Sequence, residues 1–456
     1  VYIILPKSIR NRASFRIFEA RHPVHCPWHR MQHAASLYAK GNIIVCKSQN
    51  HCMLTALASY AMPNYIRPFE MRHLALLLVA ALLFSCDKLD EERQRVDLPP
   101  LDLTFIIYMV GDNNLSSNIE SNLIAIETGM GRMSHSINVV ALVDRAELPP
   151  QLLSLQHDGY GGVERQVLRE YGETNVVDTA FMAGVLREAA ELCPSSHYVL
   201  DLWSHGMGWL PAELPFYPTH RWFGQDSSAY MDIKDLAKVL QSSGLHYDFL
   251  MFDACLMATV EVAYELRHAA DCIVASPIEV WEMGFPYATI MPALERYDRA
   301  VAVAEAYAAY YDGEYDSNYG IKMTGAISVI DCAAMGHLAE VVRTQLGSLA
   351  PSYDESIVRD IMRYDRHTNH YLYDFGDYMT KLLGEEGAAP VKEALDGTFR
   401  YRYSTPTFGT GSSKLDLDPS RYTGIGSYVP RMSYTGWNAY YKTLQWFEDT
   451  EHLPIY

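Results

Sequence analysis

Residues 247–265 read YDFLMFDACLMATVEVAYE, in which a short apolar run ends in Asp253, Ala254 and Cys255 and a stretch with helical spacing follows. We predict a buried strand ending at Cys255 and a helix over 257–269. At the mouth of a helix, unpaired N–H groups and the positive end of the helix dipole favour a thiolate. The same N–H groups could hold an oxyanion on a substrate carbonyl. By itself, however, a free cysteine is more often a small buried apolar residue.

Other short apolar runs along the chain alternate with stretches of helical spacing. The expected strands are LTFIIYMV (103–110), INVVALVD (137–144), HYVLDLWSHG (197–206), CIVAS (272–276) and GAISVID (325–331). The expected helices cover residues 115–128, 177–192, 232–243, 299–312 and 333–349. This alternation predicts an α/β fold with a mainly parallel central sheet covered on both faces.

In such sheets, ligands and reactive groups gather beyond the carboxyl ends of the strands. The run ending in SHGMG places His205 at such an end, 50 positions before Cys255. A thiol nucleophile needs an acid or base partner, and the two residues project from the same edge of the predicted sheet. Gly206 removes side-chain bulk beside the histidine, so that its backbone can approach a substrate. A histidine at a strand end is by itself more often structural, so the pairing with Cys255 carries the interpretation.

The two motifs FDACLMATVEVAYEL and WSHGMGW closely resemble those of the clostripain family of cysteine peptidases, in the clan that also holds caspases, gingipains, legumains and separases. The resemblance is best over 103–290. It implies a caspase-like α/β/α sandwich and peptide-bond hydrolysis through a Cys-His dyad. Cys255 would be the nucleophile, His205 the general acid and base, and the backbone N–H groups of Gly206 and Cys255 the oxyanion site. The clan requires no third triad residue.

The resemblance also implies a substrate preference. The family's acidic residue two positions before the nucleophile corresponds to Asp253, which would bind Arg or Lys before the cut; a helix cap is the alternative. Relatives carry a second acidic residue after the next strand, often in a Gly-Asp-Gly run. This chain has ASPIEVWEMGFPY (275–287) instead, so we expect Glu279 or Glu282 to take its place.

Several relatives in the clan are made as zymogens and cut between the histidine and cysteine motifs. The Pro-rich insert LPAELPFYPTHRWFGQDSS (210–228) contains one basic residue, Arg221. We therefore expect autoprocessing near Arg221, with an ordinary active-site loop as the alternative.

The N-terminal part of the chain has the form of an export signal. Residues 71–85 combine a basic Arg72 with an apolar run, and the ending LFSC resembles a lipobox in which Cys86 is lipidated. A short buried apolar helix is the alternative. Residues 1–70 carry excess positive charge, unlike the chain as a whole, and are expected to be an upstream artefact; 86–102 are expected to be a charged tether. These features predict an outer-membrane or cell-surface lipoprotein anchored through Cys86.

The remaining composition excludes several classes of function. A formal net charge of −18 disfavours nucleic-acid binding. A phosphatase would need Arg where Glu261 stands, and the chain has no G-x-S-x-G, H-E-x-x-H or P-loop motif. We expect no metal site and no required cofactor, although calcium stays possible. The partners would be peptide or protein substrates.

The expected organisation is a peptidase core over 103–350 followed by a Tyr/Gly-rich extension of helices and short strands over 351–456. The alternative to an enzyme is a catalytically inactive lipoprotein that keeps the peptidase fold as a peptide- or protein-binding module.

Overall fold

The structure is a computed structural model that describes residues 98–211, 223–313, 315–316, 321–347, 355–366, 370–409 and 414–450. These residues belong to one compact unit, Arg93–Tyr456. The expected leader, Cys86 and Arg221 lie outside the described residues. Within the described part, no helix is both long and apolar enough to cross a membrane.

A nine-stranded sheet forms the centre of the fold. Its strand order is β14-β12-β9-β8-β5-β1-β2-β3-β4. The bounds are β1 Pro100–Gly111, β2 Ser136–Arg145, β3 Leu148–His157, β4 Val163–Glu170, β5 Tyr198–Trp203, β8 Tyr247–Asp253, β9 Ala270–Ala275, β12 Ala326–Asp331 and β14 Phe399–Ser404. The five central strands, β2-β1-β5-β8-β9, pair in parallel, and the strands on either side pair antiparallel. The predicted fold class is therefore confirmed.

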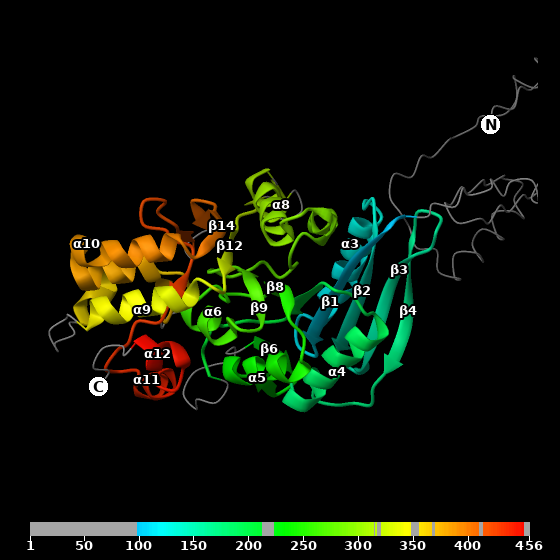
Figure 1. Cartoon of the computed structure of the whole chain (residues 1–456), viewed down its shortest axis with the longest axis horizontal. Helices are drawn as coiled ribbons and strands as arrows, with labels where there is room; N and C mark the ends of the chain where they lie inside the picture. The colour runs from blue at the N-terminus through cyan, green and yellow to red at the C-terminus, as the bar shows by residue number, and fades with distance from the viewer. Residues whose placement is uncertain are drawn as a thin grey trace, which may run out of the picture. The chain divides into compact units, whose positions relative to one another are not determined.

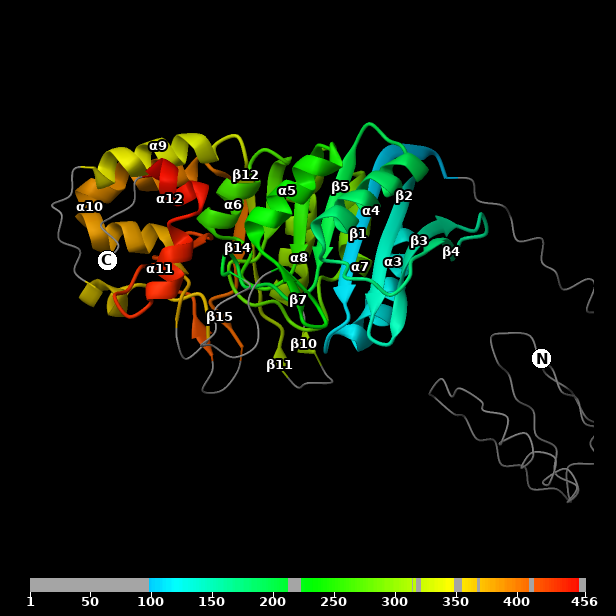
Figure 2. The ribbon, with the colours of Figure 1, turned by 90° about the horizontal axis from the view of Figure 1, so that it is seen from below.

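Helices cover both faces of this sheet. On one face lie α3 (Ile119–Met130), the short α7 (Tyr287–Ile290) and α8 (Arg299–Gly313); on the other lie α4 (Thr179–Leu192), α5 (Ile233–Ser243) and α6 (Val260–Leu266) (Figure 1, Figure 2). Side chains alternate between the two cores along each strand. In β8, Leu250 and Phe252 pack in one core, whereas Phe249 and Met251 pack in the other. The central strands are therefore largely apolar, although Asp201 of β5 and Asp253 of β8 are buried.

The hairpin β3–β4 was not predicted. Its first strand begins Leu-Pro-Pro, which is a turn signal in sequence terms, and its second strand has the charged sequence VERQVLRE. β4 forms the edge of the sheet and most of its residues are not buried. Charged side chains suit such an edge because they discourage pairing with another chain. They also leave no apolar run from which this strand could be predicted.

The C-terminal residues extend the same sheet and pack on it. β14 pairs with β12, and α9 (Met335–Leu346) packs against α10 (Phe375–Asp396) and α12 (Gln445–Thr450), with α11 (Thr435–Tyr441) nearby (Figure 2). Short two-stranded pairs make up most of the rest: β6 (Phe223–Asp226) with β7 (Ala229–Met231), β10 (Tyr315–Asp316) with β11 (Ile321–Lys322), β13 (Tyr373–Asp374) with β17 (Gly426–Ser427), and β15 (Thr407–Phe408) with β16 (Leu415–Asp416). Three 3-10 helices, η2 (Ser116–Asn118), η3 (Met291–Glu295) and η4 (Glu355–Asp360), complete the described elements. The division at residue 350 stays a prediction.

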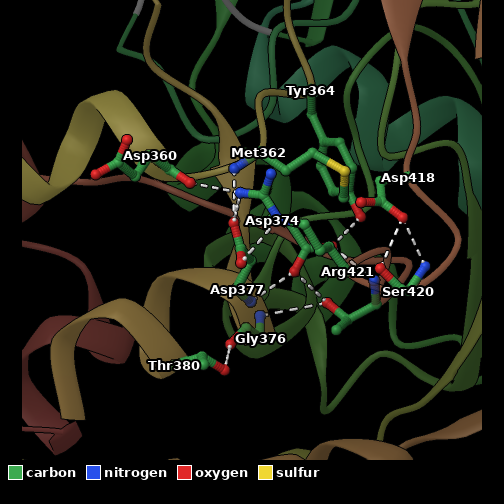
Figure 3. Close-up of polar contacts among 11 residues, drawn as sticks. Asp360, Met362, Tyr364, Asp374, Gly376, Asp377, Thr380, Asp418, Ser420 and Arg421 are labelled. Atoms are coloured by element: carbon green, nitrogen blue, oxygen red, sulfur yellow. Dashed lines mark hydrogen bonds and ion pairs between the residues drawn. The ribbon is translucent and has the colours of Figure 1, made fainter. Parts of the chain in front are cut away.

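Two buried aspartates at the start of α10 hold this C-terminal region together (Figure 3). Asp374 caps α10 by accepting the Asp377 N–H at 2.8 Å, and it also accepts the Tyr364 hydroxyl. Asp377 accepts the backbone N–H of Met362 at 2.7 Å and both Nε and Nη2 of Arg421. Residues 362–364, residues 374–377 and the later Arg421 are thereby joined at one helix N-terminus.

Candidate active site

The register of β5 and β8 determines how the two predicted catalytic residues are placed. These parallel strands are neighbours, and Trp203 pairs with Asp253 at their carboxyl ends. His205 and Cys255 each lie two residues beyond that pair. Equal offsets from a registered pair bring the two residues to the same place at the carboxyl edge of the sheet. The predicted edge is thus the one at which both residues occur.

Gly206 explains how closely the two turns approach each other. A Cβ at this position would lie 2.6 Å from the carbonyl oxygen of Cys255 and 2.9 Å from the Cβ of Ala254. Any side chain would therefore force the turn after β5 away from the turn after β8. Sequence reasoning assigned the missing bulk to the approach of a substrate, whereas in the structure it allows the approach of Cys255.

His205 is held at both its backbone and its ring. Its carbonyl oxygen accepts the N–H of Gly224 at 3.1 Å, and Gly206 forms a β-bridge with Phe223. Its Nε2 lies 2.8 Å from Oδ1 of Asn114. With the amide oxygen as acceptor, Nε2 carries the proton, which orients the ring.

Asn114 was missed as a site residue. It belongs to the GDNN segment that follows β1, the strand next to β5. The neighbouring Asn113 holds this loop by donating to the carbonyl oxygens of Val110 at 3.1 Å and Gln225 at 2.7 Å. Polar residues at the end of an adjacent strand were the available signal, although they do not indicate which residue would reach the histidine.

The prediction that Cys255 opens a helix is wrong. After Cys255 the backbone turns at Leu256 with φ of +64°, and α6 begins only at Val260. Thr259 caps α6 by accepting the Val262 N–H at 3.2 Å, so Asp253 is not a helix cap either. The dipole of α6 therefore starts too far along the chain to act on the thiol as predicted.

The Cys255 thiol is hydrogen-bonded to the backbone of Val280. The Val280 N–H donates to the Cys255 sulfur at 3.2 Å. The S–H group in turn donates to the Val280 carbonyl oxygen, with 3.6 Å between sulfur and oxygen. The residue keeps some exposure, yet burial of the thiol raises its pKa to about 12. The N–H of Val280 opposes this rise, and the charges of Glu279 and Asp253 add to it. In this state the sulfur is a neutral thiol at physiological pH.

The segment that covers the thiol is anchored by its own side chains. Glu279 pairs with Arg366, whose Nε lies 3.1 Å from Oε1, and Arg366 also stacks over the Phe408 ring at 4.9 Å. Trp281 Nε1 donates to the Thr324 carbonyl oxygen at 2.7 Å.

The two candidate second acids differ in availability. Glu279 is already neutralised by an internal cation, whereas the Glu282 residue is exposed. Of the two residues, Glu282 has the carboxylate that is more accessible to a ligand in solution, because it is exposed and Glu279 is paired with Arg366.

Asp253 is buried on the face of the sheet that packs against α3, α7 and α8. Its Oδ2 accepts the Phe285 N–H at 2.8 Å and lies 2.9 Å from the Tyr287 hydroxyl. That hydroxyl also lies 2.6 Å from Oδ2 of Asp201 on β5. Burial raises the pKa of Asp253 to about 7, and hydrogen bonds from Phe285 and Tyr287 oppose the rise.

The described cysteine and acidic residues form neither a disulfide nor a cluster that could hold a metal ion. Cys193, Cys255, Cys272 and Cys332 are the described cysteines and all are free thiols. No group of three or more His, Cys, Asp or Glu among the described residues is arranged to hold a metal ion.

Comparison with known proteins agrees with this geometry. The profile of the clostripain family of peptidases matches residues 107–398. The chain is 27% identical to clostripain of Hathewaya histolytica in an alignment 306 residues long that covers 59% of this chain and 52% of that protein. It thus spans about half the length of this curated relative.

Two solved structures are similar over nearly their whole length. One is a secreted C11 cysteine protease from Bacteroides thetaiotaomicron in complex with an irreversible peptide inhibitor (29% identity, TM-score 0.67, 77% of this chain and 99% of that one). The other is an inactive zymogen C11 protease from Parabacteroides distasonis (30% identity, TM-score 0.66, 78% and 99%).

Proposed function

Because the chain belongs to the clostripain family, we propose that it is a cysteine endopeptidase that uses Cys255 as nucleophile and His205 as general acid and base. One observation carries the proposal: both residues lie two positions beyond the registered pair of Trp203 and Asp253 on neighbouring parallel strands. Gly206 lets the two turns touch. The cysteine proteases among the similar structures support the same reaction class.

In the proposed mechanism, the Cys255 sulfur attacks the scissile carbonyl carbon and its proton passes to His205. The backbone N–H groups of Gly206 and Cys255 stabilise the oxyanion that forms. His205 then donates the proton to the leaving amine, and a water molecule hydrolyses the acyl-enzyme. Asn114 keeps Nε2 of His205 occupied, so that Nδ1 is the nitrogen that exchanges the proton.

The high pKa of the Cys255 thiol sets a requirement for this mechanism. A neutral thiol bonded to Val280 is a poor nucleophile. Binding of substrate therefore has to separate the sulfur from the Val280 backbone and bring it to His205. The pair of Glu279 and Arg366 resists that movement because it holds the covering segment in place.

We place the preferred cut after Arg or Lys. Asp253 is the acid next to the nucleophile, and among the described residues it has no ion-pair partner. Glu282 is the second acid in this proposal, since Glu279 is paired with Arg366.

Autoprocessing near Arg221 is part of the same proposal. Phe223 and Gly224 follow that position closely and form the backbone contacts to Gly206 and His205. A cut after Arg221 would leave these contacts at a new chain end, directly beside the site. A similar protease solved as an inactive zymogen supports this kind of control.

We also propose that the protein is exported and held at the membrane by a lipid on Cys86. A similar protease is described as secreted, and the segment around Cys86 has the form of a lipoprotein signal. Mass spectrometry of a membrane fraction would show a lipidated N-terminal peptide beginning at Cys86. An N-terminus elsewhere, without lipid, would overturn the anchor.

The deciding experiment is turnover of fluorogenic peptides with Arg, Lys or a neutral residue before the cut. We expect cleavage after Arg and Lys, lost in Cys255→Ala and His205→Ala with thermal unfolding unchanged. Cleavage after neutral residues alone would keep the dyad and reject the basic preference.

The second candidate is an inactive peptidase-fold module that binds peptides. The hydrogen bond between the Cys255 sulfur and Val280 favours this second candidate, because a neutral, hydrogen-bonded thiol is a poor nucleophile. Failure of an active-site-directed electrophile to label Cys255, before and after limited proteolysis at Arg221, would support this candidate.

A further inference from the structure

Two buried carboxyl groups share one tyrosine hydroxyl beneath the site. The Tyr287 oxygen lies 2.6 Å from Oδ2 of Asp201 and 2.9 Å from Oδ2 of Asp253. Both distances are hydrogen-bond distances, but the hydroxyl has only one proton to donate. If both carboxyl groups were ionised, one of the contacts would join two oxygens with no proton between them. One carboxyl group must therefore be protonated and donate to Tyr287.

The surroundings decide which carboxyl group holds the proton. Oδ2 of Asp253 also accepts the Phe285 N–H at 2.8 Å, a donor besides Tyr287 that stabilises its ionised form. Asp201 is fully buried, and its Oδ1 has no hydrogen-bond partner among the described residues. Burial, with the charge of Asp253 added to it, raises the pKa of Asp201 well above its usual value, and hydrogen bonding with Tyr287 and with the Asp253 backbone only partly opposes the rise. The proton therefore belongs to Asp201.

We propose that Asp201 is a neutral carboxylic acid that donates to Tyr287, which in turn donates to Asp253. Asp201 and Tyr287 are then positioning residues for the Asp253 carboxylate, which binds a basic substrate side chain. The proposal rests on the proposed preference for Arg or Lys. The chain of donation runs in one direction from β5 through α7 to β8. Above about pH 7, it leaves Asp253 as the single anion of the three groups.

No positive charge within the described residues neutralises that anion. The titratable groups that interact with it are Asp201, Cys255, Tyr287, and Tyr307 and Tyr311 of α8, none of which is cationic. Asn122 of α3 lies close by and is neutral, and Gly284 leaves room for both, since a Cβ there would lie 2.6 Å from Oδ2 of Asp253. A buried carboxylate without a counter-ion is costly. A basic substrate side chain would supply the missing charge.

The protonation state is testable without any measurement of activity. Infrared spectroscopy resolves the C=O stretch of a protonated carboxyl group from that of a carboxylate. At pH 8, the wild-type spectrum minus the Asp201→Asn spectrum should show the C=O stretch of one protonated carboxyl group. The spectrum of the Asp253→Asn variant should still contain that stretch. Absence of the signal from the difference spectrum would overturn the proposal.

The positioning role is tested by substrate selectivity. The readout is the ratio of kcat/KM for Arg peptides to that for matched neutral peptides. Asp201→Asn preserves a donor to Tyr287, so this ratio should stay within about threefold of the wild-type value. Asp201→Leu and Tyr287→Phe remove a link in the chain of donation, so each should lower the ratio about tenfold or more, mainly through KM. Asp235→Asn and Tyr160→Phe, both away from the cluster, are the matched controls.

The outcomes separate the two proposals. If Asp253→Asn loses the basic preference while Tyr287→Phe and Asp201→Leu keep it, the positioning role is wrong and the function stands. If the wild-type enzyme cleaves peptides with no basic preference, the proposed selectivity fails and the role of Asp201 in it fails too. Should Asp201→Leu not fold, Tyr287→Phe and the infrared signal still decide.

Discussion

The backbone N–H of Val280 donates to the sulfur of Cys255 at 3.2 Å, so the proposed nucleophile is covered by the segment that follows β9. This contact accompanies a thiol pKa of about 12, raised chiefly by burial. The described state is therefore a resting state of the proposed dyad, whose two residues occupy one edge of the sheet without an activated sulfur.

The reactivity of Cys255 should reflect this resting state. Because its thiol pKa is about 12, alkylation by iodoacetamide should rise about tenfold per pH unit between pH 7 and 9, with no plateau. Glu279→Gln removes a charge that raises the pKa and should speed the reaction, whereas Glu393→Gln on the exposed part of α10 should not. Peptide mass spectrometry measures both rates. A plateau near pH 7 that disappears in His205→Ala would indicate a preformed ion pair instead.

Gly206 should tolerate no side chain. In Gly206→Ala the new Cβ would meet the Cys255 carbonyl oxygen at 2.6 Å, so the two turns must separate. We expect kcat/KM to fall about 100-fold and stability to fall by about 1–3 kcal/mol. Gly172→Ala, whose Cβ would meet nothing within 4 Å, is the control. Equal activity of the two variants would show that the approach of the turns is not needed.

Asn114 should affect the histidine through its ring nitrogen. Asn114→Ala removes the acceptor 2.8 Å from Nε2 of His205, and kcat should fall about 10- to 100-fold with little change in KM. Asn114→Asp restores an acceptor and adds a negative charge, which favours the imidazolium. Its pH–rate profile should therefore move its acidic limb to higher pH. A profile identical to that of Asn114→Ala would argue against contact with the ring.

Glu261 should make the stability depend on pH. Burial raises its folded-state pKa from 4.5 to about 7, so the folded state binds this proton more tightly than the unfolded state does. Its stabilising contribution is present below pH 4.5 and is lost as the pH rises to about 7. The shift corresponds to a change of about 3 kcal/mol.

The comparison variant is Glu261→Gln, which keeps an acceptor for Ser427 and Tyr428 but cannot ionise. Urea unfolding should show wild type losing stability relative to this variant between pH 5 and 8. The exposed Glu385→Gln is the control. A constant difference between wild type and Glu261→Gln across this range would contradict the prediction.

Asp377 should stabilise the C-terminal region. Asp377→Ala removes the acceptor for the Met362 N–H and leaves Arg421 without its carboxylate (Figure 3). Since the aspartate is buried, we expect a loss of about 2–3 kcal/mol in the free energy of unfolding. Asp416→Ala, which breaks the exposed pair with Lys414, should cost less than about 1 kcal/mol. Similar losses in both variants would mean that burial does not strengthen the first pair.

Much of the core could be predicted from short-range pattern. The apolar runs around Tyr108, Leu142, Leu202 and Phe252 became the central parallel strands, because burial on both faces favours apolar side chains on both sides of a strand. The hairpin of β3 and β4 could not be found in this way. Its strands begin with prolines or carry charges, and only their pairing at the edge of the sheet makes them strands.

The sequence by itself determined the fold class and the two residues that the family motifs mark, since His205 and Cys255 each follow an apolar strand and lie in distinctive local sequences. The surroundings of those residues were decided only by tertiary structure. Asn114, Val280 and Tyr287 reach the site from other elements, and no local pattern encodes such contacts. Burial, which is a property of the assembled layers, made Cys255 a neutral thiol where the local sequence predicted a helix mouth.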